Sequence, residues 1–252
     1  VKRKFSGGNT VASSVTGPQR PRLDRYVGNG GLGFEMDSNR AWLISGTGNL
    51  ALGDYTLQSI TGYSKFNADR VNGFDQTIPG GNGAHTSNSV YNRYPERFHQ
   101  FSEELRLLSP TGEMLEYVLG AYYDNSTYFM QNNTGFDLPW LNYLGLQHSN
   151  FDQTSRTFSV YGQGTLNLTG DFRVIGSLRY TNTRKSATFV GLLDYGPYPL
   201  RPLSTAAGRR TDKNVDPSIS VQYDVAPDVM LYASFGRGSK SGGFVSNTFG
   251  VV

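Results

Sequence analysis

Charged side chains that could line a path or perform acid–base chemistry gather near the middle of the chain. Glu104 and Arg106 stand two residues apart, Glu116 follows shortly after, and Arg179 comes later. Residues two apart in a strand point to the same face, so Glu104 and Arg106 share one. One interpretation is a ligand path lined with charge. The interpretation we favour is a lumenal ladder of cross-strand pairs that fixes strand register.

Catalytic chemistry has weak support in this sequence. Glu104 and Glu116 could suggest glycoside hydrolysis, which uses two flanking carboxyl groups, but nothing places a sugar between them. The chain contains no cysteine, which excludes a thiol nucleophile, a Cys-based zinc site and a disulfide scaffold. Its three histidines, at positions 85, 99 and 148, lack the spacing of metal ligands. We therefore expect no catalytic residue, no metal and no cofactor, and a protein that is not an enzyme.

A second candidate site lies in Tyr128–Thr154, a segment rich in aromatic and amide side chains. Aromatic rings can stack on a sugar or an aromatic chelator while amides set its orientation. Alternatively, the rings pack the loop onto itself, as in larger surface loops. The candidate ligand-binding residues are Tyr128, Phe129, Trp140, Tyr143 and His148.

Basic residues are scattered over several segments outside the expected strands: Arg20, Arg22, Arg25, Arg184, Lys185, Arg201, Arg209, Arg210, Arg237 and Lys240. A cationic mouth would attract anionic solutes such as ferric chelates. The alternatives are adhesion to anionic lipopolysaccharide and ordinary solvated charge. The formal net charge is +3, but the cations do not share one docking element, so we expect no nucleic-acid partner.

The elements that must position these side chains are predicted to be β-strands joined alternately by short and long connections. Tight turns are predicted at Leu52–Asp54, Pro110–Glu113, Thr169–Asp171 and Ala226–Asp228, and irregular loops at Ala68–Glu96, Tyr128–Thr154 and Lys185–Asp212. A compact soluble domain rarely tolerates several long structureless loops. An outer-membrane barrel, in contrast, has short periplasmic turns and long external loops.

Period-two alternation supports this prediction. In Met114–Asp124, Leu115 and Tyr123 share a face opposite Glu116 and Asp124. Similar alternation, of varying clarity, occurs in Ala41–Leu50, Tyr55–Phe66, Phe98–Leu108, Ser155–Asn167, Phe172–Thr183, Asn214–Asp224 and Val229–Phe235. No apolar run approaches the ~18 residues of a spanning helix, whereas a spanning strand needs only ~9–11 alternating residues.

One charged residue interrupts this pattern. Glu103 falls on the apolar face that Phe101 and Leu105 define. Charge that faces lipid is costly at the midplane and cheaper near the interface. We therefore expect Glu103 to lie near the end of its strand or to be stabilised by a neighbour. Aromatic residues expected in an interfacial girdle are Trp42, Tyr55, Tyr63, Tyr117, Tyr123 and Tyr232.

A soluble β-sandwich is the competing fold, because alternation there separates core from solvent. Its strands would usually be nearer ~5–6 residues, whereas several segments here run to ten or more. Five stretches favour the membrane fold: YTLQSITGY (55–63), FSEELRLLSPTG (101–112), LEYVLGAYY (115–123), GSLRYT (176–181) and LYASFGRGSKSGGF (231–244). Their succession resembles the TonB-dependent receptors, the active transporters of the bacterial outer membrane.

The resemblance implies a barrel of about 22 strands with an N-terminal plug inside it. Such receptors bind scarce nutrients of the siderophore, cobalamin, haem or oligosaccharide class, and the inner-membrane TonB complex supplies energy. This chain has room for about eight to ten strands. We find neither plug nor TonB box in it. We therefore interpret residues 1–252 as part of an all-β, antiparallel up-and-down transmembrane barrel.

A section of barrel leaves two unpaired edges, which cannot lie in hydrocarbon. Either the rest of a larger barrel completes the wall or the piece is an open curved sheet; a small closed barrel is a further option. We expect a monomeric outer-membrane receptor that contacts lipid and lipopolysaccharide, a small-molecule nutrient and, through the missing plug region, the TonB complex. The alternatives are a passive porin or channel and a soluble carbohydrate-binding β-domain.

Overall fold

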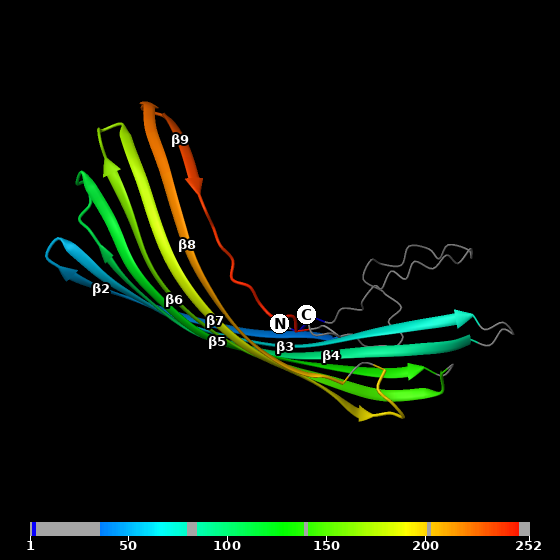
Figure 1. Cartoon of the computed structure of the whole chain (residues 1–252). Coiled ribbons are helices and arrows are strands. Elements are labelled where there is room, and N and C mark those ends of the chain that lie inside the picture. Colours follow the sequence, from blue (N-terminus) through cyan, green and yellow to red (C-terminus); the bar gives the residue numbers. More distant parts are fainter. Residues whose placement is uncertain (1, 4–35, 80–84, 139–140, 201–202, 247–252) are drawn as a thin grey trace.

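The computed structural model describes residues 2–3, 36–79, 85–138, 141–200 and 203–246 (Figure 1). These residues form one nine-stranded antiparallel sheet in which each strand pairs with its neighbours in sequence. The strands are β1 (Lys2–Arg3), β2 (Met36–Leu52), β3 (Tyr55–Pro79), β4 (His85–Leu108), β5 (Leu115–Leu138), β6 (Tyr143–Asn167), β7 (Phe172–Tyr195), β8 (Thr205–Ala226) and β9 (Val229–Gly236). No helix among the described residues has the length and hydropathy needed to cross a membrane.

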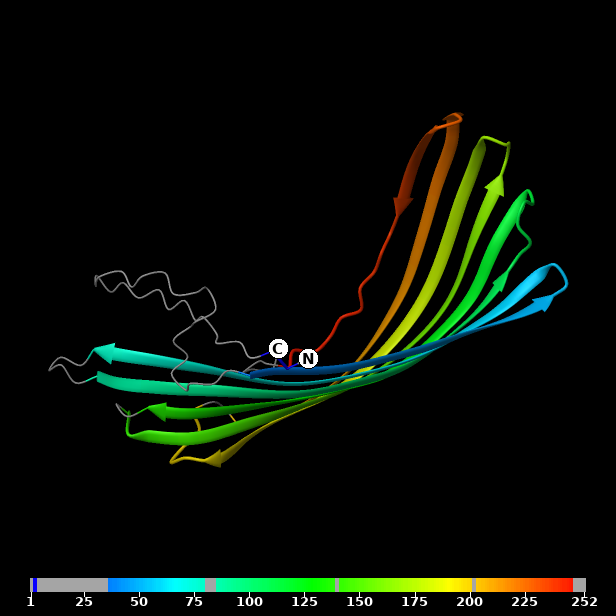
Figure 2. The same cartoon turned by 180° about the vertical axis from the view of Figure 1, so that it is seen from behind.

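The sheet is a single curved layer with β1 and β9 at its edges, as the two opposite views show (Figure 1, Figure 2). Within the described residues, no second sheet covers either face. The soluble sandwich is therefore contradicted, since its apolar side chains would be enclosed between two layers. The up-and-down topology confirms the predicted section of a membrane barrel.

The four short connections lie at one end of the strands, where the sequence predicts tight turns (Figure 1). Gly53 and Gly112 take positive φ angles of 63° and 84°, which glycine adopts without steric cost. In the third turn, the Thr169 hydroxyl accepts hydrogen bonds from the backbone N–H groups of Asp171 and Phe172. Local turn chemistry therefore closes this rim.

The predicted irregular loops are wrong in most of their length. β3 and β4 are separated only by residues 80–84, and β5 and β6 only by residues 139–142. β7 continues to Tyr195 and β8 begins at Thr205. Polar side chains occupy both faces of these extensions, so no alternation marks them in the sequence. Cross-strand pairing nevertheless satisfies their backbone N–H and C=O groups, and the strands continue.

The turn-proximal half of the sheet presents a continuous apolar surface on one side. Leu105, Ala121, Val160, Tyr180 and Val215 lie in one register row across five strands. We call this surface the apolar belt. Its exposed members include Ile44, Leu50, Leu105, Leu115, Leu119, Val160, Leu178, Val215, Ile219, Val221, Leu231 and Phe235. Soluble monomers rarely expose such a patch, so this outer face suits lipid.

An aromatic girdle borders the apolar belt on the side away from the short turns. Its members, one from each of β2 to β7, are Trp42, Tyr63, Phe101, Tyr123, Phe158 and Tyr180. Two residues further along the strands stand Arg40, Lys65, His99, Asn125, Arg156 and Asn182. Tyr232 does not belong to the predicted girdle, because it pairs with Gln222 on the opposite face. The girdle marks the outer interface of the membrane.

The girdle also reports the strand tilt. In the strand pairs β2/β3, β4/β5 and β6/β7, the two girdle residues are two positions out of register with each other. In the pairs β3/β4 and β5/β6, the two girdle residues lie directly opposite each other. An average step of ~1 residue per strand, at ~3.3 Å rise and ~4.8 Å strand spacing, gives a tilt of ~35°. Membrane barrels have tilts of about 35–45°. The girdle is therefore level when the strands cross a membrane at the tilt of a barrel.

Glu103 lies within the apolar belt and is stabilised by neighbours, as predicted. The hydroxyls of Ser59 and Thr61, both on β3, each donate a hydrogen bond of 2.6 Å to one of its carboxylate oxygens. Both acceptor oxygens are thereby satisfied on the lipid-facing side. The two hydroxyls reduce the penalty of a charge in this position.

Candidate functional site

A compact polar cluster lies on the inner face, at the level of the apolar belt. Arg106 donates to Glu104 over 2.8 Å, and the Tyr161 hydroxyl donates to the other carboxylate oxygen over 2.5 Å. The Arg179 guanidinium lies 5.5 Å from the ring centroid of Tyr161 and 5.7 Å from that of Tyr122. We call these five residues the lumenal cluster. It joins β4, β5, β6 and β7 through side chains.

A glycine makes this arrangement possible. Gly120 on β5 pairs with Arg106 on β4 and with Tyr161 on β6. A Cβ at Gly120 would overlap the Tyr161 ring. The bare backbone therefore lets Tyr161 cross β5 and reach Glu104 two strands away. Reasoning from sequence missed this glycine, because its role depends on the register of three strands.

Three of the four residues predicted in the charge ladder come together, and the fourth does not. Glu104, Arg106 and Arg179 all belong to the lumenal cluster, whereas Glu116 accepts a 2.8 Å hydrogen bond from the backbone N–H of Gly112 in the second short turn. Glu116 thus stabilises a turn. The choice between register ladder and ligand path stays a prediction for the other three.

The five aromatic and imidazole candidates do not form one binding loop. They lie on or between β5 and β6, and alternation sends neighbouring side chains to opposite faces. Tyr128 and Tyr143 lie on the inner face, and Phe129 and His148 lie on the outer face. Trp140 lies outside the described residues. The described members therefore do not share one surface, and the role of each in ligand binding stays a prediction.

Tyr143 and His148 both have partners within the fold. Tyr143 is 2% exposed, and its hydroxyl donates a 2.7 Å hydrogen bond to the carbonyl of Tyr198 in the β7–β8 connection. His148 lies 2.6 Å from a carboxylate oxygen of Asp194 on β7. Tyr143 thus behaves as the self-packing alternative predicts. Its ring has little surface left for a ligand.

Tyr128 belongs instead to an aromatic surface that crosses five strands of the inner face. Phe66, Phe98 and Tyr128 occupy one register row of β3, β4 and β5. Met130, Phe151 and Phe189 occupy the next row, over β5, β6 and β7. We call these six residues the aromatic shelf. The rings of Tyr128 and Phe151 meet edge to face at 6.1 Å.

Charged residues lie beside the aromatic shelf on the inner face, at the end of the shelf that is farther from the short turns. Tyr128 donates a 3.2 Å hydrogen bond to Glu96, which lies 3.5 Å from a guanidinium nitrogen of Arg70. Arg70 also lies 3.6 Å from Asp37. Burial, with the negative charge of Glu96 in support, raises the pKa of Tyr128 to about 12. The phenol therefore remains a neutral donor at neutral pH.

The basic residues predicted to form a cationic mouth divide between the two faces. Arg184 and Arg209 point outward, whereas Lys185 and Arg210 point inward. Lys185 donates to the carbonyl of Gly242, and Arg210 pairs with Asp212 at 2.9 Å. The inward pair therefore helps to hold the chain segment after β9. Arg20, Arg22, Arg25 and Arg201 lie outside the described residues.

Metal binding has no geometric support in the part of the chain that the structure describes. Within those residues, no three His, Cys, Asp or Glu side chains gather as metal ligands would. The inner face offers instead aromatic surface, hydrogen-bond donors and paired charges. Such groups can hold and orient a solute without any covalent chemistry.

Comparison with known proteins gives the same architecture. A family profile described as "TonB dependent receptor-like, beta-barrel" matches residues 2–251. The pesticin receptors of Yersinia enterocolitica (serotype O:8 / biotype 1B) and Yersinia pestis are each 24% identical over 172 residues, which cover 68% of this chain and 23% of each receptor. The chain thus spans about a quarter of the length of these relatives.

Two solved structures share the fold. The ferric yersiniabactin uptake receptor FyuA from Yersinia pestis matches with a TM-score of 0.62 and 20% identity, over 80% of this chain and 28% of that receptor. The ferric-catecholate import receptor Fiu from E. coli K12, in its open form, matches with a TM-score of 0.58 and 14% identity, over 80% of this chain and 36% of that receptor. The chain belongs to the TonB-dependent receptor family of the bacterial outer membrane and forms a section of its β-barrel.

Proposed function

We propose that this chain forms the wall and the outward-reaching strands of a receptor that captures a scarce nutrient and admits it across the outer membrane. The class we favour is a ferric siderophore, and the role is transport rather than catalysis. The plug and the energy coupling to TonB belong, in this proposal, to a part of the receptor beyond residues 1–252. The two solved structures, whose names refer to ferric yersiniabactin and to ferric catecholates, support this class.

The observation that carries the proposal is the aromatic shelf above the lumenal cluster. Flat aromatic rings offer stacking surface to an aromatic chelator. Each stacked ring contributes about 0.5–1.5 kcal/mol beyond the area it buries. Phe66, Phe98, Tyr128 and Phe189 are half-buried and keep surface for such stacking, whereas Met130 and Phe151 are buried beneath them in contacts of the fold.

Consecutive residues on opposite faces give a matched test. The full receptor, purified in detergent, is titrated with a panel of ferric siderophores, haem, cobalamin and oligosaccharides while intrinsic fluorescence is recorded. Tyr128→Ala removes a ring from the inner face, and Phe129→Ala removes its neighbour from the outer face. We expect Tyr128→Ala to weaken ferric-siderophore binding about three- to tenfold and Phe129→Ala to leave it unchanged.

Two results would contradict the proposal. If both variants bind the chelate as well as the wild type does, the aromatic shelf is not the capture surface. If the receptor binds haem, cobalamin or an oligosaccharide and no ferric siderophore, the favoured class is wrong. Uptake of the bound ligand by cells with and without TonB then tests the energy source.

A further inference from the structure

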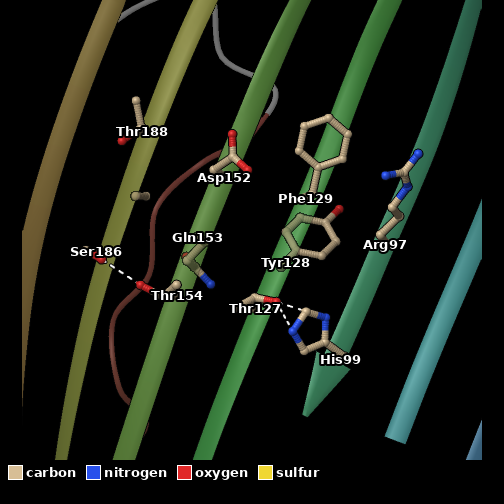
Figure 3. Close-up of a pocket in the computed structure, with 11 residues that line it drawn as sticks. Arg97, His99, Thr127, Tyr128, Phe129, Asp152, Gln153, Thr154, Ser186 and Thr188 are labelled. Carbon is tan, nitrogen blue, oxygen red and sulfur yellow. Dashed lines mark hydrogen bonds between the residues drawn. The ribbon is translucent and has the colours of Figure 1, made fainter.

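A shallow groove of about 520 Å³ lies on the outer face, just beyond the aromatic girdle. Figure 3 shows the residues that line it. The side chains that open into it come from four strands, and include Arg97, His99, Thr127, Phe129, Thr154 and Ser186. We call it the outer groove. The register rows place it directly beyond Phe101 and Phe158. The headgroups of the outer leaflet lie at this level, since aromatic girdles mark the interface.

Two arginines lie opposite each other beside the outer groove, in the outward-facing register row between its lining pair Thr154 and Ser186 and the aromatic girdle. Arg156 on β6 and Arg184 on β7 are cross-strand partners on the outer face, and both are exposed. Neither forms an ion pair with any described residue; Arg156 only donates a long hydrogen bond of 3.4 Å to Asn125. Like charges directly opposite destabilise a sheet. An anion between the two guanidinium groups would relieve this repulsion.

Hydroxyl groups stand in the next register row. Thr154 and Ser186 are cross-strand partners whose hydroxyl oxygens lie 2.7 Å apart. The hydroxyl oxygen of Thr127 lies 2.7 Å from Nε2 of His99 (Figure 3). Beyond them, the Arg97 guanidinium lies over the Phe129 ring at 5.8 Å from its centroid. The groove thus combines cations, hydroxyls and an aromatic face. Phosphate oxygens bind the first two, and sugar rings stack on the third.

We propose that the outer groove binds the phosphorylated sugar headgroup of an outer-leaflet lipid. The phosphoryl group lies between Arg156 and Arg184, the sugar extends towards Phe129, and the acyl chains descend along the apolar belt. A lipid fits better than a soluble phosphate, because the outer groove is continuous with the lipid-facing surface. Asp152 lines the side of the groove that is farther from the two arginines. Its negative charge directs the phosphoryl group to the arginine pair.

The test uses the full receptor in detergent and native mass spectrometry. The probes are a diphosphorylated, acylated glucosamine disaccharide and the same lipid without phosphates. We expect the wild type to retain the phosphorylated lipid at least tenfold better than the dephosphorylated one. Arg156→Gln with Arg184→Gln should remove this preference. Arg40→Gln, which removes a cation at the same membrane level on β2, should leave it unchanged. Far-UV circular dichroism confirms that each variant is folded.

Asp152→Asn provides a second, oppositely directed variant, because loss of its charge should increase retention of the phosphorylated lipid about two- to threefold. Equal retention of the two lipids by the wild type would overturn the proposal. So would a double arginine variant that retains the phosphorylated lipid fully. If free glucosamine phosphate displaces the lipid at comparable concentration, the outer groove is a site for soluble anions instead. Nutrient binding does not enter this readout, so its failure and that of the proposed function are distinguishable.

Discussion

The hydroxyl of Tyr161 on β6 donates a 2.5 Å hydrogen bond to Glu104 on β4, across the intervening strand β5. The contact skips one strand because Gly120 on β5 leaves room for the ring. In a barrel wall, where backbone pairing joins only adjacent strands, such a bond ties non-adjacent strands together. A bond of this kind opposes a shift of β4 relative to β6, as the predicted register ladder requires.

Gly120→Ala should destabilise the barrel, because a Cβ there displaces the Tyr161 ring and breaks its bond to Glu104. We expect the free energy of unfolding to fall by about 1–3 kcal/mol, measured by denaturant titration in lipid vesicles. Gly176→Ala is the matched control, because a Cβ at that strand glycine meets no atom within 4 Å. Equal effects of the two substitutions would mean that the crossing by Tyr161 contributes nothing.

Removal of the two hydroxyls beside Glu103 should expose an unsatisfied carboxylate to lipid. The double variant Ser59→Ala with Thr61→Ala is expected to have a lower free energy of unfolding than the wild type. Adding Glu103→Leu should recover most of the loss, because the charge that needed the hydroxyls is gone. Denaturant titrations of the double and triple variants provide the check. A triple variant as unstable as the double would contradict this account.

The predicted register ladder and the ligand path differ in what Arg106→Gln should do. If Arg106 mainly fixes register, the unfolding free energy falls by about 1 kcal/mol and the uptake rate of the ligand stays as in the wild type. We expect this result. A fall in uptake at unchanged stability would instead assign Arg106 to the path. Both quantities are measured on the full receptor, by denaturant titration and by uptake into cells.

Asp212 should hold the segment after β9 in a pH-dependent way. Its hydrogen bonds to Arg210 and to the Gly242 backbone N–H lower its pKa below the ordinary 3.8. A lowered pKa stabilises the bound segment above pH ~4, and this stabilisation is lost as pH falls through the folded value. A spin label at Ser246→Cys should therefore become more mobile only in strong acid. Asp212→Asn should mobilise it already at neutral pH, and an immobile label there would refute the contact.

The membrane half of the fold was predictable because lipid imposes a strict pattern. Alternation in segments such as Asn214–Asp224, together with turn residues such as Gly53, located the strands and all four tight turns. Beyond the girdle, water bathes both faces and the pattern disappears. The sequence therefore suggested loops where β5 and β6 in fact continue in register.

Prediction of the site failed where it needed register. Tyr128 and Phe129 appear together in the sequence, yet strand geometry places them on opposite faces. Phe66, Phe98 and Phe189 were not predicted as site residues, because only pairing across β3 to β7 brings them into one surface with Tyr128. The contact between Glu104 and Arg106 was predictable, because spacing within a single strand sufficed to place both on one face.

Spin-label accessibility at consecutive positions of β7 tests the central claim most directly. Ser177→Cys and Leu178→Cys point to opposite faces in the membrane-spanning half of the sheet. In lipid vesicles, the label at position 178 should collide mainly with dissolved oxygen, and the label at position 177 with a polar nickel chelate. Reversed accessibility, or two labels in the same environment, would show that this wall does not separate lipid from a wet interior.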